Sequence, residues 1–546
     1  MKISTLWYAS FFWGIFTSCD HKQKAALIVH HAVIYTADEN FSSAQAMAIR
    51  DGKILAIGSE DSIMNNYIAD SVVDAQGKII FPGFIDAHCH LTGFATDMWK
   101  CSLIGTGSFD EVVNKIKAYS LHTPMQWIYG RGWDQNDWAV KEFPDKAVFD
   151  SMFPDRPVFL KRIDGHAALL NQKALDLAGI NASTKINGGE VELKNGKLTG
   201  ILLDNAMSFA EKAVPAIADS TAKRYFSAAQ EYAFAAGLTG VHDPGISEHT
   251  VDLLKQAEKD QSLKIKIFAL LSDDSTYYDR WVKSGPYTSP HLHVGGFKFY
   301  ADGALGSRGA CLLKDYSDKP GWKGFLLSDE QHFRKAAELF AGTQLQMCTH
   351  AIGDSGNRMI LKIYAEVLKG KNDKRWRIEH AQVVDPADFQ YFADNNIIPS
   401  VQPTHATSDM YWAGDRLGPQ RIKTAYAYKQ LLQTNGWMPL GTDFPVEYIE
   451  PIKTFYAAVV RQDAKGFPPG GFQPENSLSR KEAIYGMTIW PAKAAFEEKQ
   501  KGSLAAGKAA DFILLDTDLM TCDPNKILNT KVLETWVDGV RVWKNK

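Results

Sequence analysis

Short apolar, strand-like segments alternate with helical segments through the middle of the chain, and no other feature of the sequence limits the fold as strongly. Such alternation is typical of βα units around a parallel sheet. Eight candidate strands end near His90, at 241–243, at 265–269, near Lys298, near His350, near His380, at 398–402 and near Asp443. Eight units predict an α/β fold, a (β/α)8 barrel of the TIM type, whose chemistry lies at the C-terminal ends of its strands.

The first of these strands ends in a pair of histidines, His88 and His90, separated by one residue. Residues i and i+2 of an extended strand point to the same side, so both imidazoles would leave the strand together. Imidazole suits zinc, and a zinc site with an open position activates water. Two nearby histidines are more often ordinary surface or core residues, so the pair needs support from the rest of the chain.

Four further side chains with metal-binding chemistry follow at later strand ends. Lys298 stands in an aromatic strand, where desolvation favours a neutral amine that can take up carbon dioxide as a carbamate; pairing with Asp302 is the alternative. His350 and His380 each end an apolar strand, where a hydrogen-bonded core histidine is the alternative. Asp443 precedes a Phe-Pro pair, where it either touches a metal and accepts a proton or only forms a turn.

The two ends of the chain differ from this middle, because both read as short β segments with turns. We expect residues 24–82 and 479–546, the latter with a terminal helix, to build one small β-sandwich beside a barrel formed by 83–478. The stretch at about 97–230, after the first barrel strand, is too long for a connecting helix and predicts an inserted subdomain over the catalytic face.

Residues 1–19 have the basic start, short apolar core and small residues of a secretory signal peptide. The residues before Cys19 resemble a bacterial lipoprotein signal, in which this cysteine is lipidated, although Phe16 departs from the usual Leu or Val. An ordinary signal peptide or a retained anchor is the alternative. We therefore expect an exported lipoprotein of the cell envelope, on the periplasmic or outer-membrane side, without structural disulfides among its six cysteines.

Taken together, the motifs resemble the amidohydrolase superfamily, most closely its third family, the branch that includes N-substituted formamide deformylases. The resemblance covers nearly the whole mature chain and rests on residues 74–90, 302–308 and 502–512 together with the order of the ligand candidates. It implies a metal site of one or two divalent ions, zinc in the first place, with carbon dioxide bound as a carbamate on Lys298. The implied ligands are His88, His90, Lys298, His350, His380 and Asp443.

The resemblance also implies hydrolysis by metal-activated water, with Asp443 taking the proton of the water and returning it to the leaving amine. Four side chains are weaker candidates for substrate contacts. His166 matches an element of this branch within the insertion, Arg308 suits an oxygen-rich group, and Trp133 with Trp138 suits an apolar wall. Gln402, near His405, stands at the end of the seventh strand. Loop-stabilising hydrogen bonds and packing are the alternative for each of them.

The composition excludes one class of partner. The net charge is −3 and no Lys/Arg-rich run occurs, so nothing favours nucleic-acid binding. We expect a small-molecule substrate and membrane contact only through an N-terminal lipid. A homo-oligomer is also possible for such a chain. The expected function is hydrolysis of a non-peptide C–N bond in a formamide, an N-acyl amine or a cyclic amide. A metal-dependent isomerase or lyase, and a non-catalytic ligand-binding envelope lipoprotein, are the alternatives.

Overall fold

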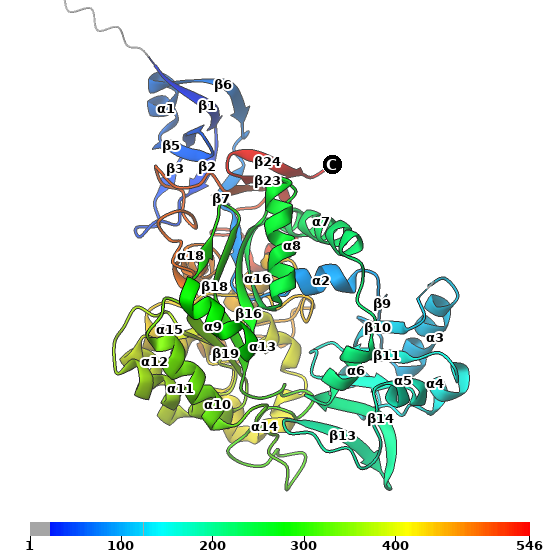
Figure 1. Ribbon diagram of the computed structural model, residues 1–546. Helices are drawn as coiled ribbons and strands as arrows, with labels where there is room; N and C mark the ends of the chain where they lie inside the picture. Colours follow the sequence, from blue (N-terminus) through cyan, green and yellow to red (C-terminus); the bar gives the residue numbers. More distant parts are fainter. Residues whose placement is uncertain (1–21, 124) are drawn as a thin grey trace, which may run out of the picture.

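The protein is described by a computed structural model that covers residues 22–123 and 125–546. The predicted signal peptide and Cys19 lie outside these residues. A β-sandwich, a barrel and an inserted subdomain follow one another through the molecule, with the sandwich and the insertion at opposite ends (Figure 1). The five cysteines in the described part are free thiols. Among the described residues, no helix combines the length and the apolar character needed to cross a membrane.

The sandwich is built from both ends of the chain, as the alternating β segments predicted. One sheet has the order β5-β4-β1-β6 and contains β1 (Gln23–His30), β4 (Ala46–Arg50), β5 (Lys53–Gly58) and β6 (Tyr67–Asp74). The other has the order β24-β23-β22-β7-β2-β3 and contains β2 (Val33–Tyr35), β3 (Ser43–Ala44), β7 (Ile79–Pro82), β22 (Phe512–Leu515), β23 (Val532–Val537) and β24 (Val540–Lys544). Antiparallel pairing of β7 with β22 joins the two chain ends.

Strand β1 shows why this arrangement is stable. Leu27 and Val29 face the second sheet and share its core with Phe512, whereas Ile28 packs against Ile63 of α1 (Glu60–Asn66). Successive side chains of a strand point to opposite faces, so a strand covered on both faces must be apolar at nearly every position.

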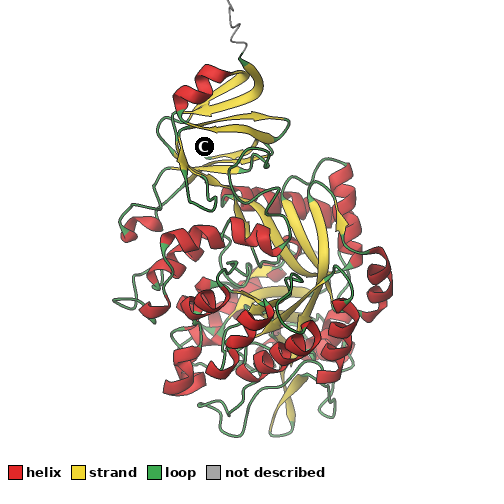
Figure 2. Ribbon diagram, turned by 90° about the vertical axis from the view of Figure 1, so that its left-hand side faces the viewer, coloured by secondary structure: helices red, strands yellow, loops and turns green. Residues whose placement is uncertain are grey.

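The barrel is a curved parallel sheet surrounded by helices (Figure 2). Its strands, in spatial order, are β8 (Phe84–Asp86), β15 (Leu238–Ile246), β16 (Lys266–Ser272), β18 (Leu292–Tyr300), β19 (Gln346–Ala351), β20 (Arg377–His380) and β21 (Ile398–Ser400). All neighbouring pairs are parallel. The short β17 (Tyr287–Thr288) adds to β18 from outside this path. These strands are almost entirely buried, as continuous apolar runs in a helix-covered parallel sheet should be.

The eighth predicted strand, before Asp443, is only a single parallel bridge between Val401 and Leu440. Its backbone still links both neighbours: Gly441 N donates to Val401 O at 3.0 Å, and Ala87 N donates to Leu440 O at 3.1 Å. Pro439 has no N–H group, so it cannot contribute a donor to a regular ladder. The barrel therefore closes through an irregular segment rather than a full strand.

Helices cover the outside of the barrel and connect its strands. The main ones are α7 (Asp219–Ala235), α8 (Glu248–Lys259), α9 (Ser275–Ser284), α10 (Glu330–Ala341), α11 (Asp354–Leu368), α15 (Tyr428–Asn435) and α16 (Pro451–Val460). Several of these helices begin at a residue whose side chain caps the first turn. In α8, the Ser247 side chain accepts from Thr250 N, Glu248 occupies the first turn and Lys259 the last, which matches the helix dipole.

The insertion has its own sheet in the order β13-β14-β12-β11-β10-β9. Its strands are β9 (Cys101–Ser102), β10 (Ile128–Trp133), β11 (Val158–Arg162), β12 (Ala167–Leu170), β13 (Gly189–Lys194) and β14 (Lys197–Asp204), and its helices are α3 (Phe109–Ser120), α4 (Ala147–Met152), α5 (Gln172–Leu177) and α6 (Met207–Ala213). Helix α7 packs against β15 and against α2 (Leu91–Asp97), so it belongs to the barrel. The predicted insertion boundary at 230 therefore lay inside a barrel helix.

Candidate metal centre

The first and last barrel segments are held together directly beneath the candidate ligands. The buried carboxylate of Asp86 accepts from the backbone N–H of His88 at 3.1 Å and of Thr442 at 3.0 Å, and from the Thr442 hydroxyl at 2.6 Å. The N–H of Asp443 donates to His88 O at 2.7 Å. These bonds place Asp443 beside His88 and His90, although Asp443 lies 353 positions after His90 in the sequence.

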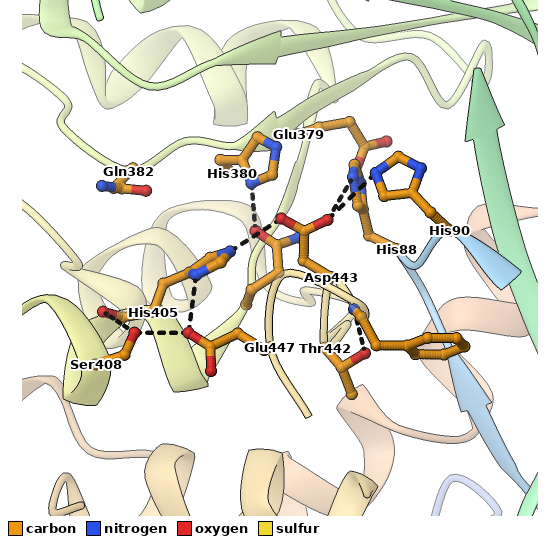
Figure 3. Close-up of polar contacts among 12 residues, drawn as sticks. His88, His90, Glu379, His380, Gln382, His405, Ser408, Thr442, Asp443 and Glu447 are labelled. Atoms are coloured by element: carbon orange, nitrogen blue, oxygen red, sulfur yellow. Dashed lines mark hydrogen bonds and ion pairs between the residues drawn. The ribbon is translucent and has the colours of Figure 1, made fainter. Parts of the chain in front are cut away.

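Asp443 lies at the centre of the site, between histidines on either side (Figure 3). Its Oδ1 is 3.3 Å from His90 Nε2 and 3.7 Å from His88 Nε2, and its Oδ2 is 3.2 Å from His405 Nε2. Two sets of side chains, His88–His90–Asp443 and His380–His405–Asp443, each bring their ligand atoms within 4.8 Å of one another. The two sets share Asp443.

The donor atoms fit a divalent metal ion. Two ligand atoms around a tetrahedral zinc at about 2.1 Å lie roughly 3.4 Å apart, close to the His90–Asp443 separation. Asp443 Oδ1 is buried and has no hydrogen-bond partner, which is costly unless a cation completes it. Burial lowers the pKa of His88 to about 4 and that of His380 well below its usual value, so both imidazoles are neutral, as metal ligands must be.

Lys298 reaches the same centre from β18. Its Nζ is 3.3 Å from His88 Nε2, and burial lowers the pKa of the amine to about 8. Within the described residues, no carboxylate lies within ion-pair distance of this Nζ. The predicted alternative, pairing with Asp302, is wrong, because Asp302 accepts the backbone N–H groups of Ile352 at 3.0 Å and of Gly353 at 2.8 Å instead.

His350 and His166 lie at the edge of the cluster. The His350 ring centroid is 4.6 Å from that of His380, but its Nε2 is directed towards Gly303 O at 3.4 Å, so it belongs to neither set described above. The insertion brings His166 to 5.1 Å from the His350 ring. Its Nδ1 is 2.6 Å from Asp204 Oδ1, which fixes the ring with Nε2 as the free nitrogen.

A cavity of about 290 Å³ opens above these side chains, between the barrel and the insertion. His90, Lys298, His350, His380 and Asp443 form part of its wall. His166 also lines it, together with groups from the insertion and from the loops after the last strands, including Asp137, Asp164, His405, Ser408 and Glu447.

Three of the predicted substrate contacts lie elsewhere. Gln402 Oε1 is 2.8 Å from His380 Nδ1, so it orients a candidate ligand from below rather than lining the cavity. Arg308 pairs with Asp318 at 2.8 Å. Trp133 is 1% exposed and packs with Trp138 in the apolar core of the insertion, because such large rings gain most from full burial. The predicted aromatic wall is therefore wrong.

Two residues at the centre were not among the predicted ligands. Glu379, fully buried, places Oε2 2.6 Å from His88 Nδ1 and Oε1 3.0 Å from Arg377 Nε. The sequence signal was an Arg-x-Glu pair next to Trp376 and Ile378 in a strand-like segment, since such charges are buried only with partners. His405, considered only beside Gln402, touches Asp443 from α13 (Pro403–Asp409) and lies 3.3 Å from Glu447.

The comparisons with known proteins agree with this geometry. Residues 71–543 match the family described as the Amidohydrolase family. The chain is 33% identical over 542 residues to Protein LONG AFTER FAR-RED 3 of Arabidopsis thaliana, covering 95% of this chain and 92% of that protein. It is 28% identical over 544 residues to N-substituted formamide deformylase of Arthrobacter pascens, covering 95% and 98%. A solved structure of an uncharacterized metal-dependent hydrolase from Pyrococcus horikoshii OT3 superposes with a TM-score of 0.75 at 26% identity, covering 91% of this chain and 99% of that one.

Proposed function

The chain belongs to the amidohydrolase family, whose members are metal-dependent, and on this premise we propose that it hydrolyses a non-peptide C–N bond. The bond is that of a formamide, an N-acyl amine or a cyclic amide. The observation that carries the proposal is the convergence of four histidines, His88, His90, His380 and His405, on the buried carboxylate of Asp443. The likeness to a formamide deformylase supports the choice of bond.

We propose zinc as the metal, because imidazole and carboxylate ligands suit it. His88, His90, His380, His405 and Asp443 would hold it. The family resemblance adds Lys298 and His350, of which His350 would have to turn its Nε2 away from Gly303 O. Two overlapping ligand sets offer positions for one ion or two. When bound, such an ion supplies Lewis-acid chemistry, which polarises a carbonyl group and makes water more acidic.

The side chains of the protein then move the protons and orient the groups. Burial alone would raise the pKa of Asp443, but the surrounding histidines hold it well below its usual value, so the carboxylate is ready to accept a proton from attacking water. It can return that proton to the leaving nitrogen. His166, held by Asp204, presents Nε2 to the cavity and is placed to contact the substrate.

We propose further that Lys298 carries carbon dioxide. The neutral amine nitrogen attacks the carbon of CO2: an N–C bond forms, one C=O π pair moves onto oxygen, and one N–H proton passes to water. The resulting carbamate would have two oxygens available to hold a metal. Replacing Lys298 with methionine, which keeps the length but cannot react, should lower the metal content and the rate together. Intact mass of the gently prepared protein should show one CO2 added to the wild type and none to the variant. A Lys298→Met enzyme with full metal and full rate would contradict the carbamate.

A substitution at Glu379 tests whether this carboxylate orients His88 for metal binding. Glu379→Gln removes the anion that holds His88 and leaves Arg377 without its partner in the interior. We expect metal affinity to fall roughly 10- to 100-fold, as for other partners of metal-bound histidines, and stability to fall by about 3 kcal/mol. Competition with a chelator and thermal unfolding measure the two effects. The control is Glu366→Gln, an exposed residue paired with Arg334; equal effects in both variants would refute this role.

The function itself is tested by a substrate screen with product analysis. Formamides, N-acyl amines, cyclic amides and dipeptides are offered to the purified enzyme, and the amine and the carboxylate are quantified separately. We expect equal amounts of both products from at least one non-peptide class. A product with the mass of the substrate would identify an isomerase instead, and cleavage of dipeptides alone would exclude the proposed bond.

A further inference from the structure

A second hollow lies beside the metal centre, outside the sheet. Its volume is about 280 Å³, and it lies between α2, α7 and α8 and reaches the end of β15. His90 lines both this hollow, which we call the slot, and the cavity above the site. The His90 side chain is 28% exposed, against 1% for His88 and 8% for Asp443, so it is the candidate ligand open to a bound molecule from this side.

The slot is suited to hydrocarbon. Its walls include Phe226, Ile246, Leu253, Leu254 and Ala257. The polar side chains around it hydrogen-bond within the protein: the hydroxyls of Ser247 and Thr250 lie 3.0 Å apart, Lys223 Nζ donates to Gln256 at 2.9 Å, and the Ser262 hydroxyl donates to Ala257 O at 3.1 Å. The buried carboxylate of Asp243 also lines the slot, and it accepts from Thr92 N at 2.8 Å. A ligand in the slot therefore finds mainly apolar surface, and most of the polar groups around it already have partners in the protein.

The cavity on the other side of His90 also has apolar walls, which include Leu305, Ile352 and Trp412, but it carries more carboxylates than the slot. Asp137, Asp164, Ser408 and Glu447 are among its lining side chains. His90 lines both hollows, so a substrate bound beside this candidate ligand has the mainly apolar slot on one side and the carboxylate-bearing cavity on the other. The two parts of an amide, the acyl chain and the amine, have the same difference in polarity when the acyl chain is aliphatic.

We propose that the slot between α7 and α8 binds the alkyl chain attached to the substrate carbonyl, so that the natural substrates are N-acyl amines with an aliphatic acyl chain rather than formamides. This rests on the proposed function and names its substrate class. An apolar cavity of about 150 Å³ holds a benzene molecule, so the slot has room for a chain of roughly eight carbons. Each methylene buried in it should tighten binding roughly fourfold.

Binding is measured without hydrolysis, using methyl alkyl ketones as probes. They carry the carbonyl group and the chain but no C–N bond. In calorimetric titrations of the metal-containing full-length protein, methyl hexyl ketone should bind roughly 60-fold more tightly than methyl propyl ketone, because it has three more methylenes. Ala222→Leu, which fills the slot from α7, should abolish most of this difference. Ala228→Leu is the control, since Ala228 lies on the same helix but does not line the slot.

Leu253→Trp fills the slot from α8 and replaces Ala222→Leu if that variant does not fold, as judged by thermal unfolding. The test is completed with two amides of the same amine, one formylated and one octanoylated. Filling the slot should lower kcat/KM for the octanoyl amide and leave kcat/KM for the formyl amide unchanged. Ketone affinity that is independent of chain length, or unchanged in both filled variants, would overturn the proposal while leaving hydrolysis intact. Ketone affinity that rises with alkyl chain length, without turnover of any amide, would instead refute the proposed hydrolysis and support the slot as a binding site for alkyl chains.

Discussion

Replacing Asp443 with asparagine should lower kcat by roughly 10²- to 10⁴-fold, the usual contribution of a positioned acid–base group. Asparagine keeps the shape of the side chain and one ligand oxygen but cannot accept a proton. Histidines on both sides remain to hold the metal, so metal content should change much less than the rate. Steady-state kinetics combined with elemental analysis of the same protein samples separates the two effects.

Asp137→Asn is the matched control for this prediction. Asp137 lines the same cavity but belongs to neither ligand set, and it is exposed to solvent. Its substitution removes a charge from the cavity wall, so KM should change more than kcat, and kcat should stay within roughly threefold of the wild type because Asp137 belongs to neither ligand set. A wild-type rate in Asp443→Asn would end the proton-transfer role. An equal loss of kcat in both variants would show that removing any negative charge from the cavity lowers the rate, and would contradict a specific role of Asp443.

The barrel could be predicted because its strands are buried on both faces and therefore appear as continuous apolar runs. The sandwich, whose β6 and β24 are largely exposed, could be predicted from short β segments separated by turn residues at both chain ends. The segment before Asp443 shows the limit of this reasoning. It is apolar and ends in a candidate ligand, yet it forms one bridge, through Leu440, because Pro439 interrupts the ladder. Similarly, the predicted insertion extends into α7, because only the contacts of α7 with α2 and β15 show that this helix covers the barrel.

Much of the site could also be predicted, because strand ends of a barrel meet at one face whatever their distance in sequence. That rule alone brings His88, His90, Lys298 and Asp443 together. It says nothing about the rotation of each side chain. His350 stands at the correct strand end but directs its Nε2 to Gly303 O.

The remaining details depend on contacts between distant segments. His405 comes from the helix after the seventh strand, and no periodicity distinguishes a helical histidine that points into the barrel from one that does not. Glu379 is recognisable as a partner of His88 only when β8 and β20 are seen to converge. Trp133 resembles a cavity residue in sequence, but the insertion has its own core, and the ring is buried there.

The most direct test of the metal-dependent account is stoichiometric reactivation. A chelator should remove the metal and abolish turnover of whichever amide the screen identifies, and zinc added back in measured amounts should restore the rate in proportion until the site or pair of sites is filled. Metal content is measured at each step by elemental analysis. We expect activity to follow bound metal, with the break at one or two ions per chain. Turnover that persists after all metal has been removed would contradict the account.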